Sequence, residues 1–458
     1  MFELKERYDL VVVGGGPAGL AVAVQAYDRG IKDILIVERK EKLGGILGQC
    51  IHTGFGVQIF GEELSGPEYA ENFVDMVKER NISVVCGATV LSINQDQSIV
   101  ITGSKCGVRR IGCGALVLSM GCRERSRGAI NVPGTRPSGV FTAGLAQRYI
   151  NLEGYKMGKD VVILGSGDIG LIMARRLALE GINVRMVCEI ESFTNGLTRN
   201  IVQCLEDFNI PLRLSHTVTM IHGKERLTGV TVAKVDENKK PIPGTEELVE
   251  CDTLLLSVGL IPENELTRRA GIRIDPVTGG PVVNEHMQTS LPWVFACGNV
   301  VHVHDLVDYV TMESCRAGDA AANYIYKQLP RFREEIPTCS AGEVRYVVPQ
   351  VITAGDDAEG DLTLYFRVKK PVTNAVIEVS CGDWVFYRGK KLKMIPGEME
   401  QVLIKAELRD TFDAIYQENI NKGKMKIDQG GLLVIKKDSQ RKGAAKTELT
   451  VSVYPEEK

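Results

Sequence analysis

The sequence predicts an α/β protein in which two similar βαβ domains, one inserted into the other, precede a β-rich C-terminal domain. Two observations predict the first part. A glycine-rich turn lies between a buried strand and a helix near residue 14, and the same arrangement returns near residue 165. A third observation predicts the second part, because after Pro330 short β-rich runs alternate with Gly, Pro, Asp and Lys.

The first glycine-rich turn belongs to a strand–turn–helix–strand unit over residues 8–38. Gly14, Gly16 and Gly19 occupy the glycine positions of G-x-G-x-x-G, which serve the tight turn, the approach of a pyrophosphate and close helix–strand packing. Glu38 ends the second strand nineteen residues after Gly19, where a carboxylate can accept ribose hydroxyls. An ordinary βαβ unit without a ligand is the competing interpretation. The residues that we assign to this dinucleotide site are Gly14, Gly16, Pro17, Ala18, Gly19 and Glu38.

The second turn repeats the pattern in KDVVILGSGDIGLIMARRLALEG, and a second strand follows it. Gly165, Gly167 and Gly170 fill the three positions, and Glu189 follows Gly170 by nineteen residues. Two Rossmann-like dinucleotide-binding domains in one chain indicate two dinucleotides, typical of a flavin that exchanges hydride with a nicotinamide. The residues that we assign to the second site are Gly165, Gly167, Asp168, Ile169, Gly170 and Glu189.

The acid at the end of the second unit favours NAD(H) over NADP(H). Glu189 would bind a free ribose 2′-hydroxyl and repel a 2′-phosphate. Residues 190–194 contain no arginine or lysine to receive that phosphate. Arg199, if the fold brings it close, would reverse this preference.

Three later segments complete the pattern: ALVLSMG ends at Gly121, DTLLLSVGLIPENEL contains Gly259, and VFACGNV contains Gly298 and Asn299. With the two turns they resemble the two-dinucleotide-domain flavoprotein reductases of the pyridine nucleotide-disulfide oxidoreductase superfamily. That group includes thioredoxin reductase, glutathione reductase and NADH oxidases. The resemblance covers residues 8 to about 330.

The resemblance implies FAD on the first domain and a nicotinamide cofactor on the second. It adds Gly45, Gly121, Gly298 and Asn299 to the FAD site, and Gly259 to the NAD site. The family has aspartate where this chain has Asn299, so the bond to the ribityl chain would come from an uncharged amide. A helix beginning near Val310 would point its N-terminus at the flavin pyrimidine edge.

A narrower resemblance lies in GGILGQCIHTGFG, GCRERSRGAINVPGTRP and ACGNVVHVHDLVDYV. These stretches are similar to FAD subunits found with glycerol-3-phosphate, proline, opine or cyanide-forming amino-acid dehydrogenases. The resemblance implies two partners: a small cysteine-rich electron-transfer protein and a second flavoprotein dehydrogenase subunit.

Twelve cysteines are scattered over the chain without a CxxC pair, which argues against structural zinc, cysteine-ligated clusters and a dithiol relay. Cys50 and His52 lie in the segment that runs beside the flavin in similar folds, and we assign both as catalytic candidates. Cys50 would be a single redox thiol, against the alternative of a packed small residue. His52 would be a proton donor, against the alternative of a hydrogen-bonding spacer.

A dense polar group follows the ribityl segment: His302, His304, Asp305 and Asp308. Imidazoles and carboxylates suit zinc or iron, but this spacing matches no metal motif that we know. We therefore interpret the group as polar side chains of the flavin site and expect no metal.

The net charge, the apolar runs and the cysteines of the chain indicate where the protein is located and which partners it does not bind. A formal net charge of −3 disfavours a general nucleic-acid or anionic-membrane binder. We find no secretory signal and no apolar run of about 20 residues that could span a membrane. We expect a cytoplasmic protein with reduced thiols, compatible with a homo-oligomer.

The expected boundaries place the FAD-binding domain at 1–145 and 266–330, the NAD(P)-binding domain at 150–265, and the C-terminal β-rich domain at 336–458. The last is a candidate subunit-interaction module, and the lysine-rich stretch KKDSQRKGAAK within it is expected to be a loop.

We interpret the chain as an FAD-dependent NAD(P)H oxidoreductase, the electron-transfer subunit of a dehydrogenase that acts on a small hydroxy or amino acid such as glycerol 3-phosphate. Two alternatives stay open. One is a stand-alone NADH oxidase or peroxidase using Cys50, and the other is a non-catalytic flavin-bearing assembly subunit.

Overall fold

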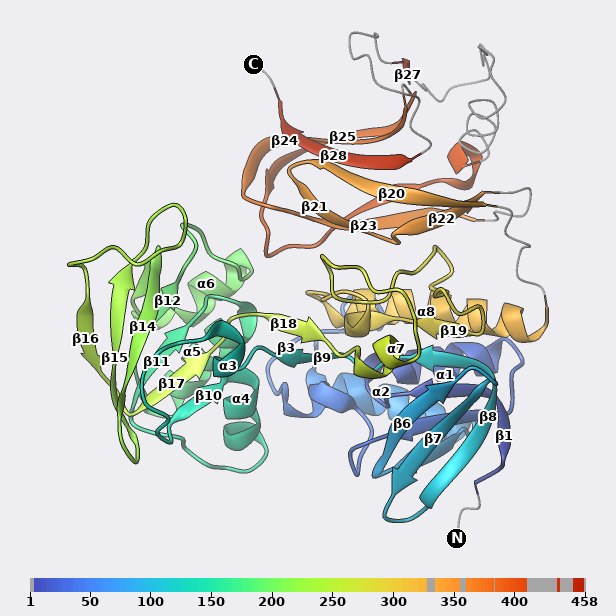
Figure 1. Cartoon of the computed structure of the whole chain (residues 1–458), viewed down its shortest axis with the longest axis horizontal. Helices are drawn as coiled ribbons and strands as arrows, with labels where there is room; N and C mark the ends of the chain where they lie inside the picture. The colour runs from blue at the N-terminus through green and yellow to red at the C-terminus, as the bar shows by residue number, and fades with distance from the viewer. Residues whose placement is uncertain are drawn as a thin grey trace. The chain divides into compact units, whose positions relative to one another are not determined.

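The computed structural model shows two compact units (Figure 1). It describes residues 4–327, 334–354, 360–382, 384–409, 435–436 and 448–456. The first unit contains Met1–Gly48, His52–Gly121 and Pro262–Lys458, and the second contains Gln49–Ile51 and Cys122–Ile261. The sequence of the second unit therefore interrupts that of the first.

The core of the first unit is a sheet with the strand order β5-β2-β1-β8-β7-β6, in which β19 also pairs with β8. β1 pairs in parallel with both β2 and β8, and the apolar residues of β1, all of β2 and the last four residues of β8 are buried. β19 follows the second unit in the sequence, and it completes this sheet by pairing with β8. The strands are β1 (Arg7–Val13), β2 (Ile34–Glu38), β5 (Ser83–Cys86), β6 (Ala88–Asn94), β7 (Ser98–Gly103), β8 (Gly107–Leu118) and β19 (Val294–Ala296).

Helices α1 (Pro17–Asp28) and α8 (Val307–Ile325) pack closely against each other. A Cβ atom on Gly318 would stand 3.0 Å from the backbone oxygen of Val22, so glycine permits this approach. α8 begins three residues before the predicted Val310. The remaining short elements of this unit are η1 (Gly45–Gln49), β3 (Thr53–Phe55), β4 (Leu64–Ser65), α2 (Gly66–Glu79), α7 (Glu265–Arg269) and η3 (Gly298–Val300).

The second unit contains a parallel sheet in the order β10-β17-β11-β12-β13 and an antiparallel sheet in the order β14-β15-β16. Helix α5 connects β11 to β12, as the second glycine-rich turn predicts. The strands are β9 (Cys122–Glu124), β10 (Val140–Thr142), β11 (Asp160–Leu164), β12 (Asn183–Glu189), β13 (Leu212–Leu214), β14 (His216–Gly223), β15 (Leu227–Lys234), β16 (Glu247–Glu250), β17 (Thr253–Leu256) and β18 (Leu260–Pro262). The helices are α3 (Arg127–Ile130), α4 (Ala143–Asn151), α5 (Asp168–Leu179), α6 (Thr198–Cys204) and η2 (Glu206–Phe208).

After α8 the chain forms two further sheets with a hydrophobic core of their own, so the α/β class with a β-rich C-terminal part is confirmed. The sheets have the orders β22-β20-β28-β24-β25-β27 and β21-β23-β26. We did not expect a strand at β20, because its run EEIPTCSAG contains proline, glycine and two glutamates. Most of KKDSQRKGAAK lies outside the described residues. The strands are β20 (Glu334–Gly342), β21 (Val344–Val348), β22 (Val351–Ala354), β23 (Leu362–Val368), β24 (Val372–Cys381), β25 (Trp384–Met394), β26 (Glu400–Ile404), β27 (Ile435–Lys436) and β28 (Leu449–Pro455).

Asp305 fastens these C-terminal sheets to the segment that precedes α8. Its carboxylate pairs with Arg367 of β23 and accepts the backbone N–H of Met399, and the two charged side chains are largely buried. Burial would lower the pKa of Arg367, but the Asp305 carboxylate beside it raises it, so the guanidinium stays charged. Arg367 also donates to the backbone oxygen of Val303 at 3.0 Å.

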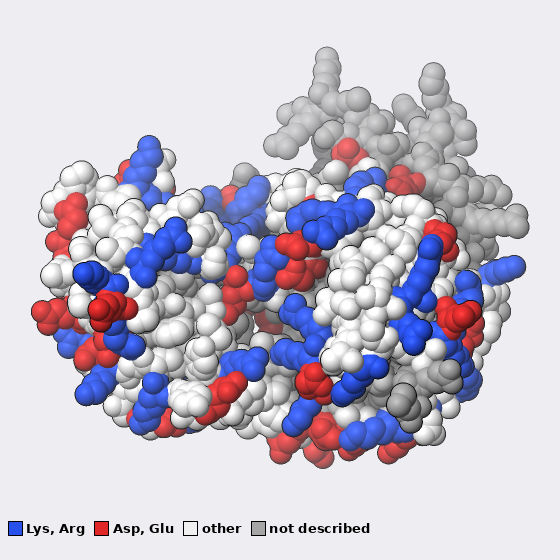
Figure 2. All heavy atoms as spheres, turned by 60° about the horizontal axis from the view of Figure 1, so that its bottom comes forward, with Lys and Arg blue, Asp and Glu red and all other residues white. Residues whose placement is uncertain are grey.

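Basic and acidic side chains are interspersed on the face drawn in Figure 2, in keeping with the small net charge of −3. Among the helices that the structure describes, none is both long and apolar enough to cross a membrane.

We expect Arg367→Met to lower the free energy of unfolding by about 3 kcal/mol, because it leaves the Asp305 carboxylate buried without its cation. Denaturant unfolding, followed by fluorescence and circular dichroism, measures this change. Lys105→Met is the control, since Lys105 and Glu41 form an exposed pair, and it should leave the unfolding curve unchanged. Equal curves for the two variants would contradict the buried role of Arg367.

Candidate functional site

Two glycines of the first turn have no room for a side chain. Gly14 has φ +109°, and a Cβ atom there would stand 2.5 Å from the backbone oxygen of Ser119 at the end of β8. A Cβ atom on Gly19 would stand 1.8 Å from the backbone oxygen of Gly14. These two glycines therefore let β1, the turn and α1 pack at the required distance.

Gly16 differs because a Cβ atom there would make only an ordinary contact. Its backbone is extended (φ −82°, ψ −175°), and the nearest atom to a Cβ placed there is the Cα of Gly45, at 3.7 Å. Gly45 has φ +60°, and Gly44 donates its N–H to the backbone oxygen of Gly15 at 2.8 Å. Two glycine backbones thus meet at the N-terminus of α1, where Gly16 is an N-cap without a side chain and Pro17 begins the helix. This space, bordered by the positive end of a helix dipole, fits a diphosphate.

Glu38 is buried and held by backbone donors. One carboxylate oxygen accepts the N–H of Gly15 at 2.7 Å, and the other accepts the N–H of Lys40 at 2.7 Å. The carboxylate therefore fixes the glycine turn to the end of β2. Each oxygen has a second lone pair, so this acid can also accept from ribose hydroxyls.

The second turn repeats this geometry around Ser257. Gly165 has φ +100°, and its Cβ would stand 2.1 Å from the Ser257 backbone oxygen, while that of Gly170 would stand 2.7 Å from the Ser257 Cβ. A Cβ on Gly167 would meet the Ser257 hydroxyl at 3.4 Å, an ordinary contact. Gly167, like Gly16, is an N-cap without a side chain.

Glu189 occupies the position of Glu38 in this second turn. It is buried, and one oxygen accepts from the Ser166 N–H at 2.9 Å and from the Ser166 hydroxyl at 2.6 Å. Its other oxygen accepts the N–H of Glu191 at 3.0 Å. Each unit thus carries the same buried acid on the same part of its turn.

Two assigned neighbours have different surroundings. Asp168, the first residue of α5, accepts from the N–H of Leu197 at 2.9 Å and from the amide of Asn200 at 2.6 Å, so it shapes the start of α6. Ile169 packs against the core of the second unit. Gly259 has φ +99° and accepts the N–H of Arg125 at 3.1 Å.

The predicted ribityl segment lies beside the first turn. Gly298 has φ +72°, and a Cβ there would stand 3.0 Å from the Cβ of Ala18 at the start of α1. The side-chain oxygen of Asn299 accepts two bonds from His304, from the backbone N–H at 3.0 Å and from Nδ1 at 3.2 Å. Gly121 has φ +71° and accepts the N–H of Glu263 at 3.0 Å.

The polar group His302, His304, Asp305 and Asp308 divides into three separate environments. Asp305 pairs with Arg367. Asp308 accepts the N–H groups of Gly56, Gln58 and Ile59 at 3.1, 3.2 and 3.1 Å, which fixes that loop to the first turn of α8.

The two histidines lie with Glu313, which the sequence analysis did not single out. Glu313 Oε2 is 2.9 Å from His302 Nε2 and 3.3 Å from His304 Nε2, and Glu313 Oε1 accepts the N–H of Gly298 at 2.7 Å. All three side chains are buried. The sequence did contain one signal for this role: Glu313 is an acidic residue in α8, the last helix before the C-terminal sheets, which is rich in small residues.

Burial lowers the pKa of His302 to about 4, because it disfavours the charged imidazolium. Burial alone would raise the pKa of Glu313, but the two neighbouring imidazoles outweigh it and hold that pKa below its ordinary range. The carboxylate of Glu313 is therefore ionised.

The two catalytic candidates lie in partly exposed positions. The Cys50 thiol points at the side-chain oxygen of Gln147, 3.9 Å away. His52 donates from Nδ1 to its neighbour, the Thr53 carbonyl, at 3.1 Å, and its ring lies 4.9 Å from that of Phe55. Their catalytic roles stay predictions.

Burial makes other thiols poor nucleophiles. It raises the pKa of Cys113, Cys188 and Cys251 to about 12, and the pKa of Cys204, Cys315 and Cys381 to about 11. These six cysteines remain protonated near neutral pH and do not supply the thiolate that disulfide chemistry needs.

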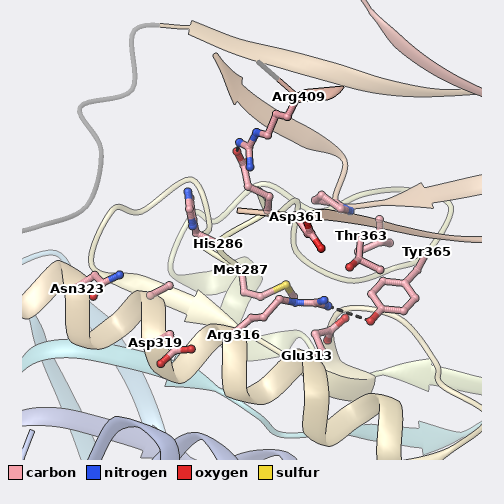
Figure 3. Close-up of a pocket in the computed structure, with 14 residues that line it drawn as sticks. His286, Met287, Glu313, Arg316, Asp319, Asn323, Asp361, Thr363, Tyr365 and Arg409 are labelled. Carbon is pink, nitrogen blue, oxygen red and sulfur yellow. Dashed lines mark hydrogen bonds and ion pairs between the residues drawn. The ribbon is translucent and has the colours of Figure 1, made fainter. Parts of the chain in front are cut away.

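A cavity of about 160 Å³ lies between α8 and the C-terminal sheets. Figure 3 shows Glu313 and Arg316 of α8 extending towards Tyr365 of β23, and Asp319 of the same helix also lines the cavity. Arg316 donates to the Tyr365 hydroxyl at 3.1 Å. The cavity also reaches the ion pair of Glu285 and Arg409, whose side chains are buried.

Residues 8–321 match the family described as pyridine nucleotide-disulphide oxidoreductase. Hydrogen cyanide synthase subunit HcnB of Pseudomonas protegens is 28% identical over 320 residues, which cover 63% of this chain and 65% of that protein. NAD(P)H sulfur oxidoreductase (CoA-dependent) of Pyrococcus abyssi is 28% identical over 317 residues, covering 66% and 65%. The A subunit of opine oxidase from Agrobacterium tumefaciens is 23% identical over 318 residues, covering 65% and 62%. The chain thus spans less than two thirds of these relatives.

Solved structures agree on the fold. Thioredoxin reductase of T. acidophilum has a TM-score of 0.58 at 24% identity, over 70% of this chain and 99% of that one. Reduced CoADR-RHD of Bacillus anthracis has a TM-score of 0.53 at 16% identity, over 93% of this chain and 78% of that one.

We expect Gly16→Ala to leave the fold intact and to weaken FAD binding at least about tenfold, because the methyl group enters the space of the diphosphate. Flavin absorbance per chain and thermal unfolding measure the two effects. Gly19→Ala should unfold the turn, since its Cβ would overlap the Gly14 oxygen.

The matched control is Gly128→Ala in α3, where the nearest atom to a Cβ is 3.8 Å away. That variant should keep wild-type flavin content. A Gly16→Ala protein with full flavin content would remove Gly16 from the diphosphate site.

Proposed function

This chain belongs to the pyridine nucleotide-disulphide oxidoreductase family, whose members depend on FAD and use pyridine nucleotides, and we propose that its reaction is hydride transfer between NAD(H) and FAD. The observation that carries the proposal is the repeated turn, in which a buried glutamate fixes a glycine-rich loop at a helix N-terminus. Two such turns suit two dinucleotides.

Bound FAD would supply the redox chemistry, by accepting or giving a hydride at its flavin ring. The residues of the chain bind and orient. Gly16 and Gly45 leave space for a diphosphate at the start of α1, and Glu38 offers a carboxylate to the adjacent ribose. Asp308 holds the loop at Gly56 to the start of α8, which keeps that loop and the helix N-terminus in a fixed arrangement.

The preference for NAD(H) over NADP(H) is part of the proposal. Glu189 is buried at the end of β12, and Glu191, two residues later, forms an ion pair with Lys239. That pair reduces the capacity of Lys239 to receive a 2′-phosphate. Arg199 is exposed on α6 and remains the residue that would favour NADP(H).

We propose that the electrons leave through a partner protein, because the sequence offers no cysteine pair of the CxxC type. The names of HcnB and of the opine oxidase relative describe subunits, which supports a multi-subunit enzyme. By this proposal one partner is a second flavoprotein that oxidises a small hydroxy or amino acid such as glycerol 3-phosphate, and another is a small cysteine-rich electron carrier.

The C-terminal sheets are our candidate for the contact with that partner, because they lie outside the matched residues 8–321. We place the reaction in the cytoplasm, since the twelve cysteines are free thiols and suit a reducing compartment.

Two rival functions remain. In the first, the chain alone reduces oxygen, peroxide or sulfur species through Cys50, and the relative named NAD(P)H sulfur oxidoreductase supports it. In the second, the nicotinamide site does not work and the chain is a flavin-bearing assembly subunit.

The test is anaerobic mixing of the FAD-loaded protein with NADH and, separately, with NADPH, while flavin absorbance is followed. We expect NADH to bleach the flavin at least about tenfold faster at equal subsaturating concentration, a difference of ~1.4 kcal/mol. Gly167→Val should retain FAD and lose the bleaching, because the side chain enters the space at the start of α5. Wild-type bleaching in that variant would contradict our assignment of the NAD site.

Cys50→Ser separates the first rival from the proposal. Sustained NADH turnover with peroxide that this variant abolishes would establish the first rival. The same bleaching by wild type and Cys50→Ser, without turnover on peroxide, agrees with transfer to a partner. The absence of bleaching by either nucleotide would favour the second rival.

A further inference from the structure

We propose that His302, His304 and Glu313 bind a divalent transition-metal ion of the zinc or iron(II) type in the first unit. The ion would join the predicted ribityl segment to α8 and would not be a redox partner of the flavin. The spacing of His302, His304, Asp305 and Asp308 matches no metal motif, so we expected no metal. The third ligand comes instead from the helix, nine residues after His304.

Two of the separations between the possible ligand atoms are close to those around one ion. Glu313 Oε2 is 2.9 Å from His302 Nε2 and 3.3 Å from His304 Nε2, and all three atoms lie within 4.8 Å of one another. Ligands at about 2.0–2.2 Å from an ion stand about 3.0–3.4 Å apart in tetrahedral or octahedral geometry. Two imidazoles and one carboxylate form a donor set that suits zinc and iron(II).

The hydrogen bonds of His304 leave its buried Nε2 atom available to a cation. The Asn299 oxygen accepts the backbone N–H of His304, so the His304 Nδ1 that also contacts this oxygen at 3.2 Å must carry a hydrogen and donate it. The opposite ring atom, Nε2, faces the Glu313 oxygen at 3.3 Å. Nε2 is buried and makes no hydrogen bond in the described part of the chain, so an ion between the two atoms would be held by both.

Neighbouring contacts already orient two of the ligands. Glu313 Oε1 accepts the Gly298 N–H at 2.7 Å, which leaves Oε2 to face the histidines. The bond from His304 Nδ1 to Asn299 fixes the imidazole tautomer, as a backbone or side-chain acceptor does for most metal-bound histidines. Both contacts end in the segment Gly298–Val300, so an ion here would stabilise that segment.

The cavity between α8 and the C-terminal sheets provides an approach to this cluster. Glu313 lines it, and the rings of His302 and His304 lie 5.8 and 6.3 Å from that of Tyr365. The charged residues of its lining are four carboxylates and two guanidinium groups: Glu285, Glu313, Asp319, Asp361, Arg316 and Arg409. Glu285 pairs with Arg409, Asp361 with Lys405 and Asp319 with Arg29, whereas Glu313 faces the two histidines.

The experiment measures metal content in the full-length, FAD-loaded protein. The protein is treated with a chelator, incubated with Zn²⁺ or Co²⁺, freed of excess ion by gel filtration, and analysed by mass spectrometry for metal per chain. We expect about one ion per wild-type chain, and a visible Co²⁺ absorption band typical of low coordination number. Chelation should lower the thermal midpoint and speed the loss of FAD, because the Gly298–Val300 segment loses its cross-link.

Two conservative variants and one control complete the test. Glu313→Gln keeps an oxygen for the Gly298 N–H and His304→Gln keeps a polar side chain, yet each should fall below about one tenth of an ion per chain. His222→Gln in β14 changes a histidine that bonds Thr231 in the second unit, and it should keep the wild-type metal content.

Metal content decides the proposal. If folded wild-type protein with full FAD content retains no ion from either solution, the cluster is a buried hydrogen-bond network that shares a proton, and the proposal is wrong. It is also wrong if Glu313→Gln binds as much metal as the wild type.

Discussion

A buried carboxylate that accepts the backbone N–H of a glycine turn is the interaction on which both dinucleotide units depend. Glu38 binds the N–H of Gly15, and Glu189 binds that of Ser166. Each bond ties the turn to the end of the second strand, and each is protected from water. Because the turn is fixed there, the helix after it begins in the position where its N-terminal N–H groups can meet a phosphate. The chain uses the same solution twice, with the same residue spacing.

Helix α8 connects the remaining parts of the first unit. Its first turn holds the loop at Gly56 through Asp308, its middle carries Glu313 beside the histidines, and Arg316 on the same helix contacts Tyr365 of the C-terminal sheets. Helix α8 thus contacts the loop after η1, the segment at Gly298 and the C-terminal sheets.

Sequence patterns predicted a residue's role correctly where its type has one physical reason to be present. Gly14 and Gly19 are required by contacts shorter than any side chain allows, so their spacing alone identified the turns. Sequence patterns did not predict a residue's role where that role depends on a partner distant in the sequence. Asp305 was grouped with the flavin site, but Arg367, sixty-two residues later, determines what it does. β20 was missed because its polar sequence pairs with β22 and β28, which lie on other parts of the chain.

The sequence was enough to predict the α/β class, the two dinucleotide units and the β-rich C-terminal part, and to show the absence of a CxxC pair. These follow from local periodicity and from glycine and acid spacing, which act over a few dozen residues. Which polar side chains meet could be learned only once the chain had been folded in three dimensions. In the folded chain Glu313 lies beside His302 and His304. Asp308 accepts hydrogen bonds from the loop at Gly56, and the backbone of Gly45 lies next to that of Gly16. Such contacts arise when helices and loops distant in sequence pack together, and no local pattern records them.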